Sequence, residues 1–429
     1  MSRSLLTFSL LALLPSVSLA SVTAGAGFSN TAVAAAPGGA FPGGMDLLPS
    51  GHVAIFDGSA VVEVDPADGS VLGTLYTPPG FVFGSFVKTD PTGSFLLFGE
   101  SLLHTITKIP LDGSPTSVVA TVSNNFDCAF DAVGAAYVTA SPSGTTTQVY
   151  RLNLVNGATD QILEITGPTG PLAFDAMNNL YYAEASGTFP APQGQQTIYR
   201  FAKAKVQTAT GPGHLTESDG IAFVPGVTSV ADLVFDDEGD LIASDSSEGT
   251  IREYDAGGNL SATIATEEPS KGITNLAFAA GNGPSVFGPF QDASGGTLVA
   301  LSSDFFSYND LNVLTPARPT LGTTPNSPIP AGPLTFEVDG GPANGTVLVL
   351  VCAQGLATEV AAYAGVTPLL VGVDHNTLVG AFVLALDGAG SVNIPANHGG
   401  APAAIFVQGF AHDGAGFVGS TPPAAIVLK

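Results

Sequence analysis

The chain has 429 residues, with 11 Lys and Arg against 36 Asp and Glu, so its formal net charge is −25. This acidic surplus opposes binding to phosphate backbones and anionic lipids, and it argues against nucleic acid and membrane surfaces as partners. The 53 Gly and 32 Pro disfavour helices, whereas 45% hydrophobic residues can fill large cores. Composition therefore favours an all-β protein with many tight turns and more than one domain.

The first twenty residues have the features of a secretory signal peptide. Arg3 supplies positive charge, residues 5–14 form a short apolar run, and residues 18–20 fit a small-x-small cleavage signal. We expect cleavage near Ala20 and an exported protein that is periplasmic, secreted or at the cell surface. No later stretch has the length and apolarity of a spanning helix, so we expect no membrane insertion. The sequence does not indicate an oligomeric state.

Residues 44–314 repeat a unit of four short apolar stretches. A residue that tolerates left-handed backbone angles marks the first turn of each unit, at Gly51, Gly93, Gly134, Asn178, Gly239 and Asn282, spaced by 42, 41, 44, 61 and 43 residues. Hairpin dipeptides mark a second turn, at Asp68-Gly69, Asp112-Gly113, Asn156-Gly157 and Gly257-Gly258. Four antiparallel strands repeated at this period predict the blades of a six-bladed β-propeller.

The boundaries of the repeat predict the domain organisation. The 61-residue spacing indicates an insertion in the fourth blade, at either 189–196 or 203–218, and the ring could close through 310–314 or through a strand near 31–36. We predict a signal peptide at 1–20, an N-terminal segment at 21–43, the propeller at 44–314 and a Pro-rich linker at 315–331. Residues 332–429 contain seven or eight short apolar stretches, which predict a small β-sandwich domain of immunoglobulin-like size.

Three stretches, Leu172–Gly187, Leu233–Gly258 and Thr274–Gly281, resemble NHL and SMP-30/gluconolactonase-type propeller repeats. The C-terminal region is similar to β modules of secreted bacterial proteins. The propeller resemblance implies a divalent cation in the central tunnel, bound by a Glu, Asn residues and an Asp. Residues 41–44 match the Glu element but contain no carboxylate, and Thr169 replaces the Asn. Only Ser218-Asp219-Gly220 resembles the Asp element, so the lactonase hypothesis is weakened.

A different set of oxygen ligands emerges when the first strands are aligned on their phenylalanines. Asp127, Asp232 and Asn275 then share one position, and Asp46 lies nearby in its own unit. If this position faces the channel mouth, its oxygens would suit Ca²⁺ or another divalent cation. The alternative is that each side chain caps its own strand or turn. The aspartates beside the turn markers are interpreted as structural: Asp90, Asp131, Asp175 and Asp236.

The two cysteines carry little functional information. Cys128 and Cys352 lie far apart in the sequence, and we expect buried thiols, although an exported protein could also form a bridge between them. No nucleophile elbow, zinc-binding helix, phosphate-binding loop or dinucleotide fingerprint occurs. The search for catalytic motifs therefore identifies no catalytic residue.

Three functional hypotheses remain. The first is a non-catalytic, exported propeller that binds or scaffolds an extracellular protein or glycan and requires no cofactor. The second is a metal-dependent hydrolase or lactonase with a cation in the tunnel. The third is a purely structural surface protein. The first hypothesis is preferred because it requires no residue that the sequence lacks.

Overall fold

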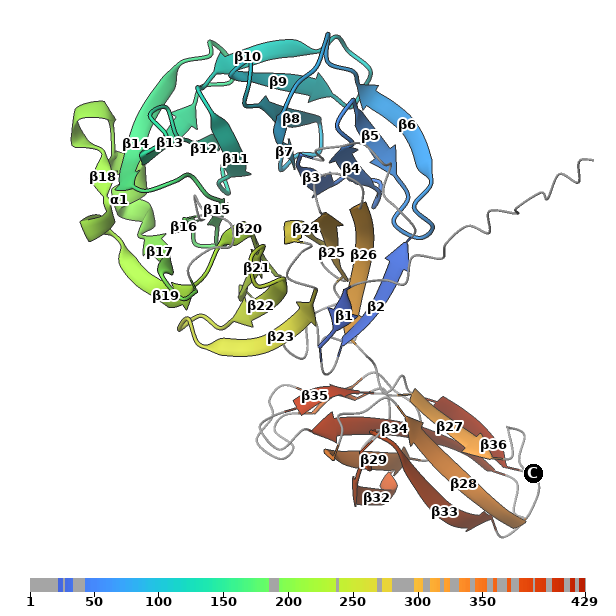
Figure 1. Ribbon diagram of the computed structural model, residues 1–429. Coiled ribbons are helices and arrows are strands. Elements are labelled where there is room, and N and C mark those ends of the chain that lie inside the picture. The colour runs from blue at the N-terminus through green and yellow to red at the C-terminus, as the bar shows by residue number, and fades with distance from the viewer. Residues whose placement is uncertain are drawn as a thin grey trace, which may run out of the picture.

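The computed structural model describes residues 22–25, 28–33, 43–184, 193–236, 239–267, 272–279, 297–303, 309–316, 320–324, 332–339, 344–352, 358–360, 369–371, 378–388, 390–398, 403–412, 417–420 and 424–428. These residues are almost entirely β-strands. Six sheets are arranged in a ring, as Figure 1 shows. Cavities lie along the centre of this ring. The predicted all-β, six-bladed propeller is confirmed.

Each blade is an antiparallel sheet whose first strand lines the channel. Blade one contains β3 (Met45–Leu47), β4 (Val53–Phe56), β5 (Val61–Val64) and β6 (Val71–Tyr76). Blade two contains β7 (Gly84–Thr89), β8 (Phe95–Glu100), β9 (Thr105–Pro110) and β10 (Ser117–Thr121). Blade three contains β11 (Asn125–Phe130), β12 (Ala136–Ala140), β13 (Thr146–Leu152) and β14 (Thr159–Thr166).

The second half of the ring repeats this order. Blade four contains β15 (Leu172–Phe174), β16 (Leu180–Ala183), β17 (Gln196–Phe201) and β19 (Ile221–Val227). Blade five contains β20 (Val230–Phe235), β21 (Leu241–Asp245), β22 (Thr250–Tyr254) and β23 (Leu260–Thr266). Blade six contains β24 (Gly272–Ala279), β25 (Thr297–Ser303) and β26 (Asn309–Pro316), and β2 (Phe28–Val33) completes it.

The turn positions have the backbone angles that the sequence predicted. Five first-turn markers have positive φ, between 65° and 91°: Gly51, Gly93, Gly134, Asn178 and Gly239. The second-turn glycines at 69, 113, 157 and 258 also have positive φ. Only Gly or an amide residue adopts this conformation cheaply, so turn sterics explain the repeat. The sixth marker, Asn282, lies outside the described residues.

Two distant parts of the chain close the ring. Strand β2 pairs antiparallel with β26, from Phe28 opposite Pro316 to Val33 opposite Leu311. The sequence offered residues 310–314 and a strand near 31–36 as alternatives, and the structure uses both regions in one sheet. A short strand, β1 (Thr23–Ala24), also joins the outer edge of blade five beside β23. The propeller therefore includes part of the segment that we predicted to precede it.

The insertion in blade four packs against blade three. It contains α1 (Lys203–Thr208), β18 (Leu215–Thr216) and two 3-10 turns, and β18 pairs in parallel with β14. Val206 and Leu215 are buried in the hydrophobic cluster between blades three and four. The predicted insertion at 203–218 is therefore an ordered excursion. The first half of the alternative position, residues 189–192, lies outside the described residues.

Aromatic pairs join neighbouring blades. Phe174 on blade four lies 4.8 Å, ring centroid to centroid, from Tyr137 on blade three. Phe235 on blade five lies 4.9 Å from Tyr181 on blade four. Such tilted contacts contribute about 0.5–1.5 kcal/mol beyond the area they bury. Phenylalanines of the first strands thus link blade four to blade three and blade five to blade four.

The C-terminal region is also built from strands. One sheet contains β27 (Thr320–Thr324), β28 (Gly332–Asp339) and β33 (Val392–His398). A second contains β29 (Thr346–Cys352), β32 (Leu378–Ala385), β34 (Ala403–His412), β35 (Phe417–Ser420) and β36 (Ala424–Leu428), and β30 (Thr358–Val360) pairs with β31 (Leu369–Val371). That these sheets pack as a sandwich stays a prediction.

One detail of the sequence interpretation is refined by the strands. Strand β27 lies inside the predicted linker and pairs with β28, because its Thr- and Leu-containing stretch between the prolines favours extended structure.

Cys128 is free and buried, as expected for a thiol in the core. The side chain of Cys352 lies outside the described residues. No helix in the described ranges has the length and apolarity needed to cross a membrane.

Candidate functional site

The central channel contains two cavities at opposite ends of the inner strands. The larger one, here called the polar cavity, has a volume of about 610 Å³ and is lined by residues near the start of these strands, including Asp127, Asp232 and Asn275. The smaller one, here called the phenylalanine cavity, has a volume of about 290 Å³ and is lined by residues near their ends. Asp46 and Lys88 line the phenylalanine cavity.

A repeated β-bulge aims the side chains of the polar cavity. The pairing of the first two strands shifts register just before Asp127 in blade three, Asp232 in blade five and Asn275 in blade six. A bulge adds one unpaired residue and turns the next side chain in a new direction. The backbone N–H of Asp127 then reaches the hydroxyl of Thr139 at 3.1 Å, and that of Asp232 reaches Ser244 at 3.0 Å. Asp127, Asp232 and Asn275 therefore follow the same irregularity in their respective blades.

Each of three aspartates accepts a hydrogen bond from the next blade. The N–H of Thr89 donates to Asp46 at 2.7 Å, linking blades one and two. The N–H of Leu172 donates to Asp127 at 3.0 Å, linking blades three and four. These donors belong to channel-lining edge strands, whose outward N–H groups have no strand partner.

Asp232 completes this arrangement for blades five and six. Its Oδ2 accepts a hydrogen bond from the N–H of Leu276 at 2.8 Å, and its Oδ1 accepts one from its own neighbour Leu233 at 2.8 Å. Asp46 likewise accepts from the following residue, Leu47, at 2.9 Å. The capping alternative is therefore correct in part, because these carboxylates cap their own strand and also the strand of the adjacent blade.

Lys88 supplies the positive charge that the three aspartates share. Its side chain is 14% exposed, and its Nζ lies 3.9 Å from Oδ1 of Asp232. Burial alone would lower the pKa of Lys88, but the attraction of Asp232, Asp127 and Asp46 outweighs it and raises that pKa. The ammonium is therefore charged at neutral pH. Lys88 lines the phenylalanine cavity, and its Nζ lies close to Asp232 of the polar cavity.

One lysine does not balance three carboxylates. Burial raises the pKa of Asp232 to about 7, although Lys88 opposes this effect, and the nearby charge of Asp127 adds to the rise. Burial also raises the pKa values of Asp127 and Asp46, again against the influence of Lys88. The centre of the channel therefore favours an added positive charge or a bound proton.

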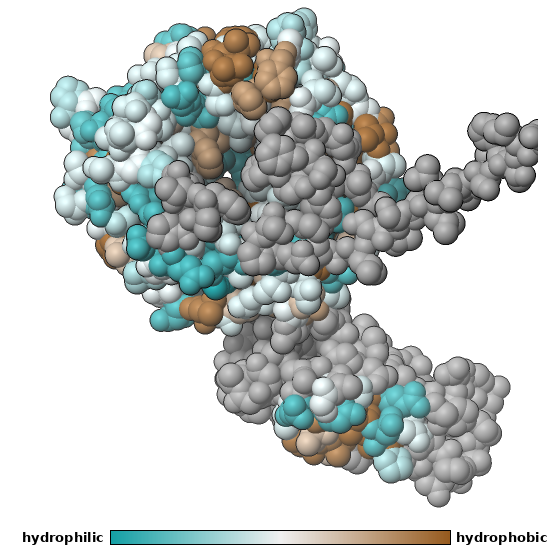
Figure 2. Space-filling view, viewed as in Figure 1, coloured by the Kyte–Doolittle hydropathy of each residue, from teal (hydrophilic) through white to brown (hydrophobic). Residues whose placement is uncertain are grey.

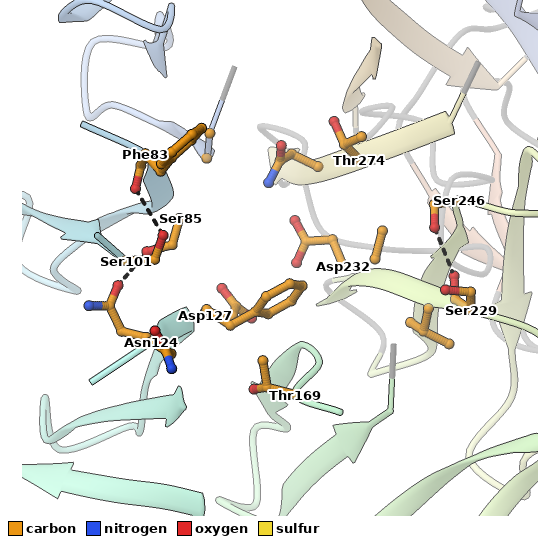
Figure 3. A pocket seen from close by; sticks show the side chains of 18 residues that line it. Phe83, Ser85, Ser101, Asn124, Asp127, Thr169, Ser229, Asp232, Ser246 and Thr274 are labelled. Atoms are coloured by element: carbon orange, nitrogen blue, oxygen red, sulfur yellow. Dashed lines mark hydrogen bonds between the residues drawn. The ribbon is translucent and has the colours of Figure 1, made fainter. Parts of the chain in front are cut away.

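The rest of the polar cavity is lined by neutral polar side chains together with Phe83, Phe126, Val230, Ala231 and glycines. Hydroxyl and amide side chains surround it, from Ser85, Ser101, Asn124, Asn125, Thr169, Ser229, Ser246, Thr274 and Asn275. Figure 3 shows Asp127 and Asp232 among them, on the inner strands of different blades. The Oγ1 of Thr169 is buried and has no hydrogen-bond partner among the described residues. Within the described lining, both ionisable residues are aspartates, and none is basic.

The opposite cavity has a different character. Phe130, Phe174, Phe235 and Phe278, one from each of four consecutive blades, line it at equivalent strand positions. Lys88 and Asp46 also line it. Its walls therefore combine four phenylalanine rings with Lys88 and Asp46, two residues of opposite charge that attract each other.

The predicted metal ligands are thus divided between the two cavities. Asp127, Asp232 and Asn275 line the polar cavity, whereas Asp46 lines the phenylalanine cavity. Among the described residues, no group of three or more His, Cys, Asp or Glu side chains has an arrangement able to hold a metal ion. A divalent cation stays a prediction. Asp219 lies in a short turn of the insertion, where it caps Thr216, and it lines neither cavity.

The turn aspartates have the structural role that the sequence indicated. Asp90 accepts backbone hydrogen bonds from Ser94 at 2.6 Å and Phe95 at 2.7 Å. Asp131 and Asp175 accept equivalent bonds within their own turns, at 2.8 and 2.7 Å. Asp236 accepts one from Gly239 at 2.9 Å. Turn geometry therefore accounts for these four residues.

Lys88 is the important residue that the sequence interpretation missed. It is the one charged residue of its strand, in a chain with few basic residues, and this was a detectable signal for a buried charge. Glu100 was also missed. It is 2% exposed, and its carboxylate accepts backbone hydrogen bonds from Phe83 at 3.1 Å and Leu102 at 2.8 Å beside the polar cavity.

Comparisons with known proteins identify similar folds. No protein-family model matches the sequence, and no curated protein matches it. A gluconolactonase from Xanthomonas campestris is 17% identical with a TM-score of 0.47, over 65% of this chain and 87% of its own. The calcium-binding protein regucalcin from Agrobacterium tumefaciens is 15% identical with a TM-score of 0.48, over 68% and 96%. Virginiamycin B lyase from Staphylococcus aureus is 13% identical with a TM-score of 0.42, over 67% and 98%.

Proposed function

We propose that this protein is an exported, non-catalytic binding protein whose polar cavity takes a small cationic ligand. The observation that carries this proposal is the charge of the cavity. Asp127 and Asp232 line it, and none of its described lining residues is basic. The nearby Lys88 is already engaged by three carboxylates. A bound ammonium group would supply the positive charge that the buried aspartates favour.

The neutral residues of the cavity support the same ligand chemistry. Hydroxyl and amide groups can replace the water that a polar ligand loses on entering the channel. The unpartnered Oγ1 of Thr169 provides one such group. A small cation therefore fits this lining better than an anion or an uncharged apolar molecule.

Catalysis is less well supported by the geometry. General acid–base or nucleophilic catalysis needs a base within hydrogen-bond reach of its partner. Asp127 and Asp232 each accept a backbone hydrogen bond from the next blade. The Ser85 hydroxyl donates to the amide oxygen of Asn125. No histidine lines the described part of the polar cavity.

Titration with tetramethylammonium chloride tests the proposal by isothermal calorimetry at constant ionic strength. Asp127→Asn removes one negative charge and keeps an oxygen that can accept the Leu172 hydrogen bond. We expect the variant to bind at least about tenfold more weakly, which corresponds to about 1.4 kcal/mol. Asp219→Asn is the matched control, because Asp219 lies outside both cavities. Equal affinities in wild type and Asp127→Asn, or no binding at all, would contradict the proposal.

A metal-dependent hydrolase is the second candidate. It is favoured by one observation, namely that Asp127, Asp232 and Asn275 line the same cavity. Calcium, magnesium and other divalent ions should be measured in protein purified without chelator. One equivalent of metal that is lost in Asp127→Asn would support this candidate, and metal-free protein that still binds tetramethylammonium would favour the binding protein.

A further inference from the structure

Four exposed hydrophobic side chains gather on blade two. Phe81 and Phe83 precede β7 and are 66% and 37% exposed, and Leu102 and Leu103 follow β8 and are 51% and 54% exposed. We call these residues the blade-two patch. The rings of Phe81 and Phe83 meet edge to face with centroids 5.0 Å apart. Figure 2 shows hydrophobic side chains gathered over blade two, at the top of the ring.

A buried carboxylate holds the two segments of the patch together. Glu100 accepts backbone hydrogen bonds from Phe83 on one segment and from Leu102 and Leu103 on the other. The N–H of Ser101 also donates to the carbonyl of Phe83 at 3.0 Å. These bonds to a charged acceptor fix the backbone from which the four side chains project. The patch is therefore an ordered surface.

The blade-two patch adjoins the polar cavity through Phe83, which lines that cavity. The ring of Phe81 packs against Phe83, and Leu102 and Leu103 directly follow Ser101, another lining residue. An acidic, hydroxyl-lined cavity thus opens beside an apolar rim. Neither the cavity nor the patch alone can bind both ends of a ligand that has a charged head and an apolar chain. Together, the cavity suits the head and the patch suits the chain.

We infer that the ligand is a small cationic amphiphile, with an ammonium head in the polar cavity and an aliphatic chain on the blade-two patch. This inference rests on the proposed function and specifies its ligand class. The chain would cover apolar surface that now faces water. An anionic amphiphile of the same length is disfavoured by Asp127 and Asp232 at the cavity and by the net charge of −25.

A series of alkyltrimethylammonium salts, from methyl to hexyl, tests the inference by calorimetry at concentrations below micelle formation. In the wild type, affinity should rise with each methylene that reaches the patch, by up to roughly fourfold per group. The double variant Phe81→Ser/Leu103→Ser should bind tetramethylammonium unchanged but lose this rise. Val155→Ser is the matched control, because Val155 is 97% exposed and does not line the polar cavity. Uncharged 1-hexanol, which has the chain without the head, measures the patch by itself.

The possible results separate the inference from the proposed function. Tetramethylammonium binding with no chain-length dependence, or a dependence that persists in the double variant, overturns the inference and leaves the proposed function intact. Failure of tetramethylammonium to bind overturns the proposed function and the head-group assignment. Binding of 1-hexanol that weakens in the double variant would then still show the patch to be a binding surface. Unchanged melting temperatures, measured for each variant, establish that the exposed substitutions leave the fold intact.

Discussion

The two ends of the channel use the same six inner strands for different purposes. At one end, four blades place a phenylalanine at the equivalent position, and three of these rings are held against an aromatic ring of the preceding blade. At the other end, the bulged positions carry Asp127, Asp232 and Asn275 among hydroxyl and amide groups. The repeat explains the first end through packing between blades. The second end departs from apolar patterning, which is typical of a functional site.

Lys88 interacts with aspartates from both ends. The three aspartates around it come from blades one, three and five, and each bonds to a backbone N–H of the following blade. The same carboxylates therefore close contacts between blades and set the charge of the channel. The comparison predicts that substitutions at the phenylalanine end alter stability, whereas some substitutions at the polar end alter binding with little loss of stability.

Lys88→Met should have the largest effect. It leaves three buried carboxylates without their shared ammonium, and we expect the free energy of unfolding to fall by about 3–5 kcal/mol. Denaturant unfolding at pH 7.5 measures the change. Lys205→Met is the control, because the side chain of Lys205 is 49% exposed and its pair with Asp219 is at the surface. A loss below about 1 kcal/mol would show that Lys88 does not hold the channel together.

Phe174→Ala should have the next largest effect and should separate stability from binding. The substitution removes the contact with Tyr137 and opens a gap between blades three and four. Because the ring is only partly buried, we expect a loss of about 2–3 kcal/mol, below the range for a fully buried phenylalanine. Tetramethylammonium affinity should be unchanged. A large loss of binding in a folded Phe174→Ala protein would mean that the two cavities are not independent.

Asp127→Ala and Asp127→Asn sharpen the comparison at the polar end. Alanine leaves the buried N–H of Leu172 without its carboxylate acceptor, and we expect a loss of about 1–3 kcal/mol. Asparagine retains an acceptor and should cost clearly less, while both variants should bind the cation more weakly. Thermal unfolding and calorimetry together test this. Equal destabilisation by both substitutions would indicate that charge, rather than the hydrogen bond, joins these blades.

The pH dependence of stability should show the smallest effect. The folded pKa of Asp232 is raised to about 7 from the ordinary 3.8. The folded state therefore binds more protons than the unfolded state between about pH 4 and 7, and the free energy of unfolding should fall as pH rises through this window. Asp232→Asn should remove this part of the slope. Burial and the charge of Glu217 also raise the pKa of Glu184 to about 7. Glu184 therefore contributes to the slope in the same direction in both proteins. Parallel slopes in the two proteins would contradict the assigned pKa.

The sequence predicted those features that repeat. Positive-φ residues such as Gly93 and Gly239 revealed the blades, because turn sterics recur in every unit. The equivalence of Asp127, Asp232 and Asn275 followed from the same alignment. Ring closure by β2 could not be chosen, because it depends on which distant strand reaches β26. The role of Lys88 was missed, since its partners come from three other blades that only the closed ring brings together.

Selective acylation of lysines tests directly whether the ammonium of Lys88 is buried among three carboxylates. Folded protein would be treated with an acetylating reagent at pH 8, and each lysine would be quantified by mass spectrometry. Lys88, whose buried ammonium is held by Asp46, Asp127 and Asp232, should remain unmodified in the folded protein, while the exposed Lys205 reacts. Lys88 should react only after unfolding. Modification of Lys88 in the folded protein at the rate of Lys205 would contradict a buried ammonium that is held by three carboxylates.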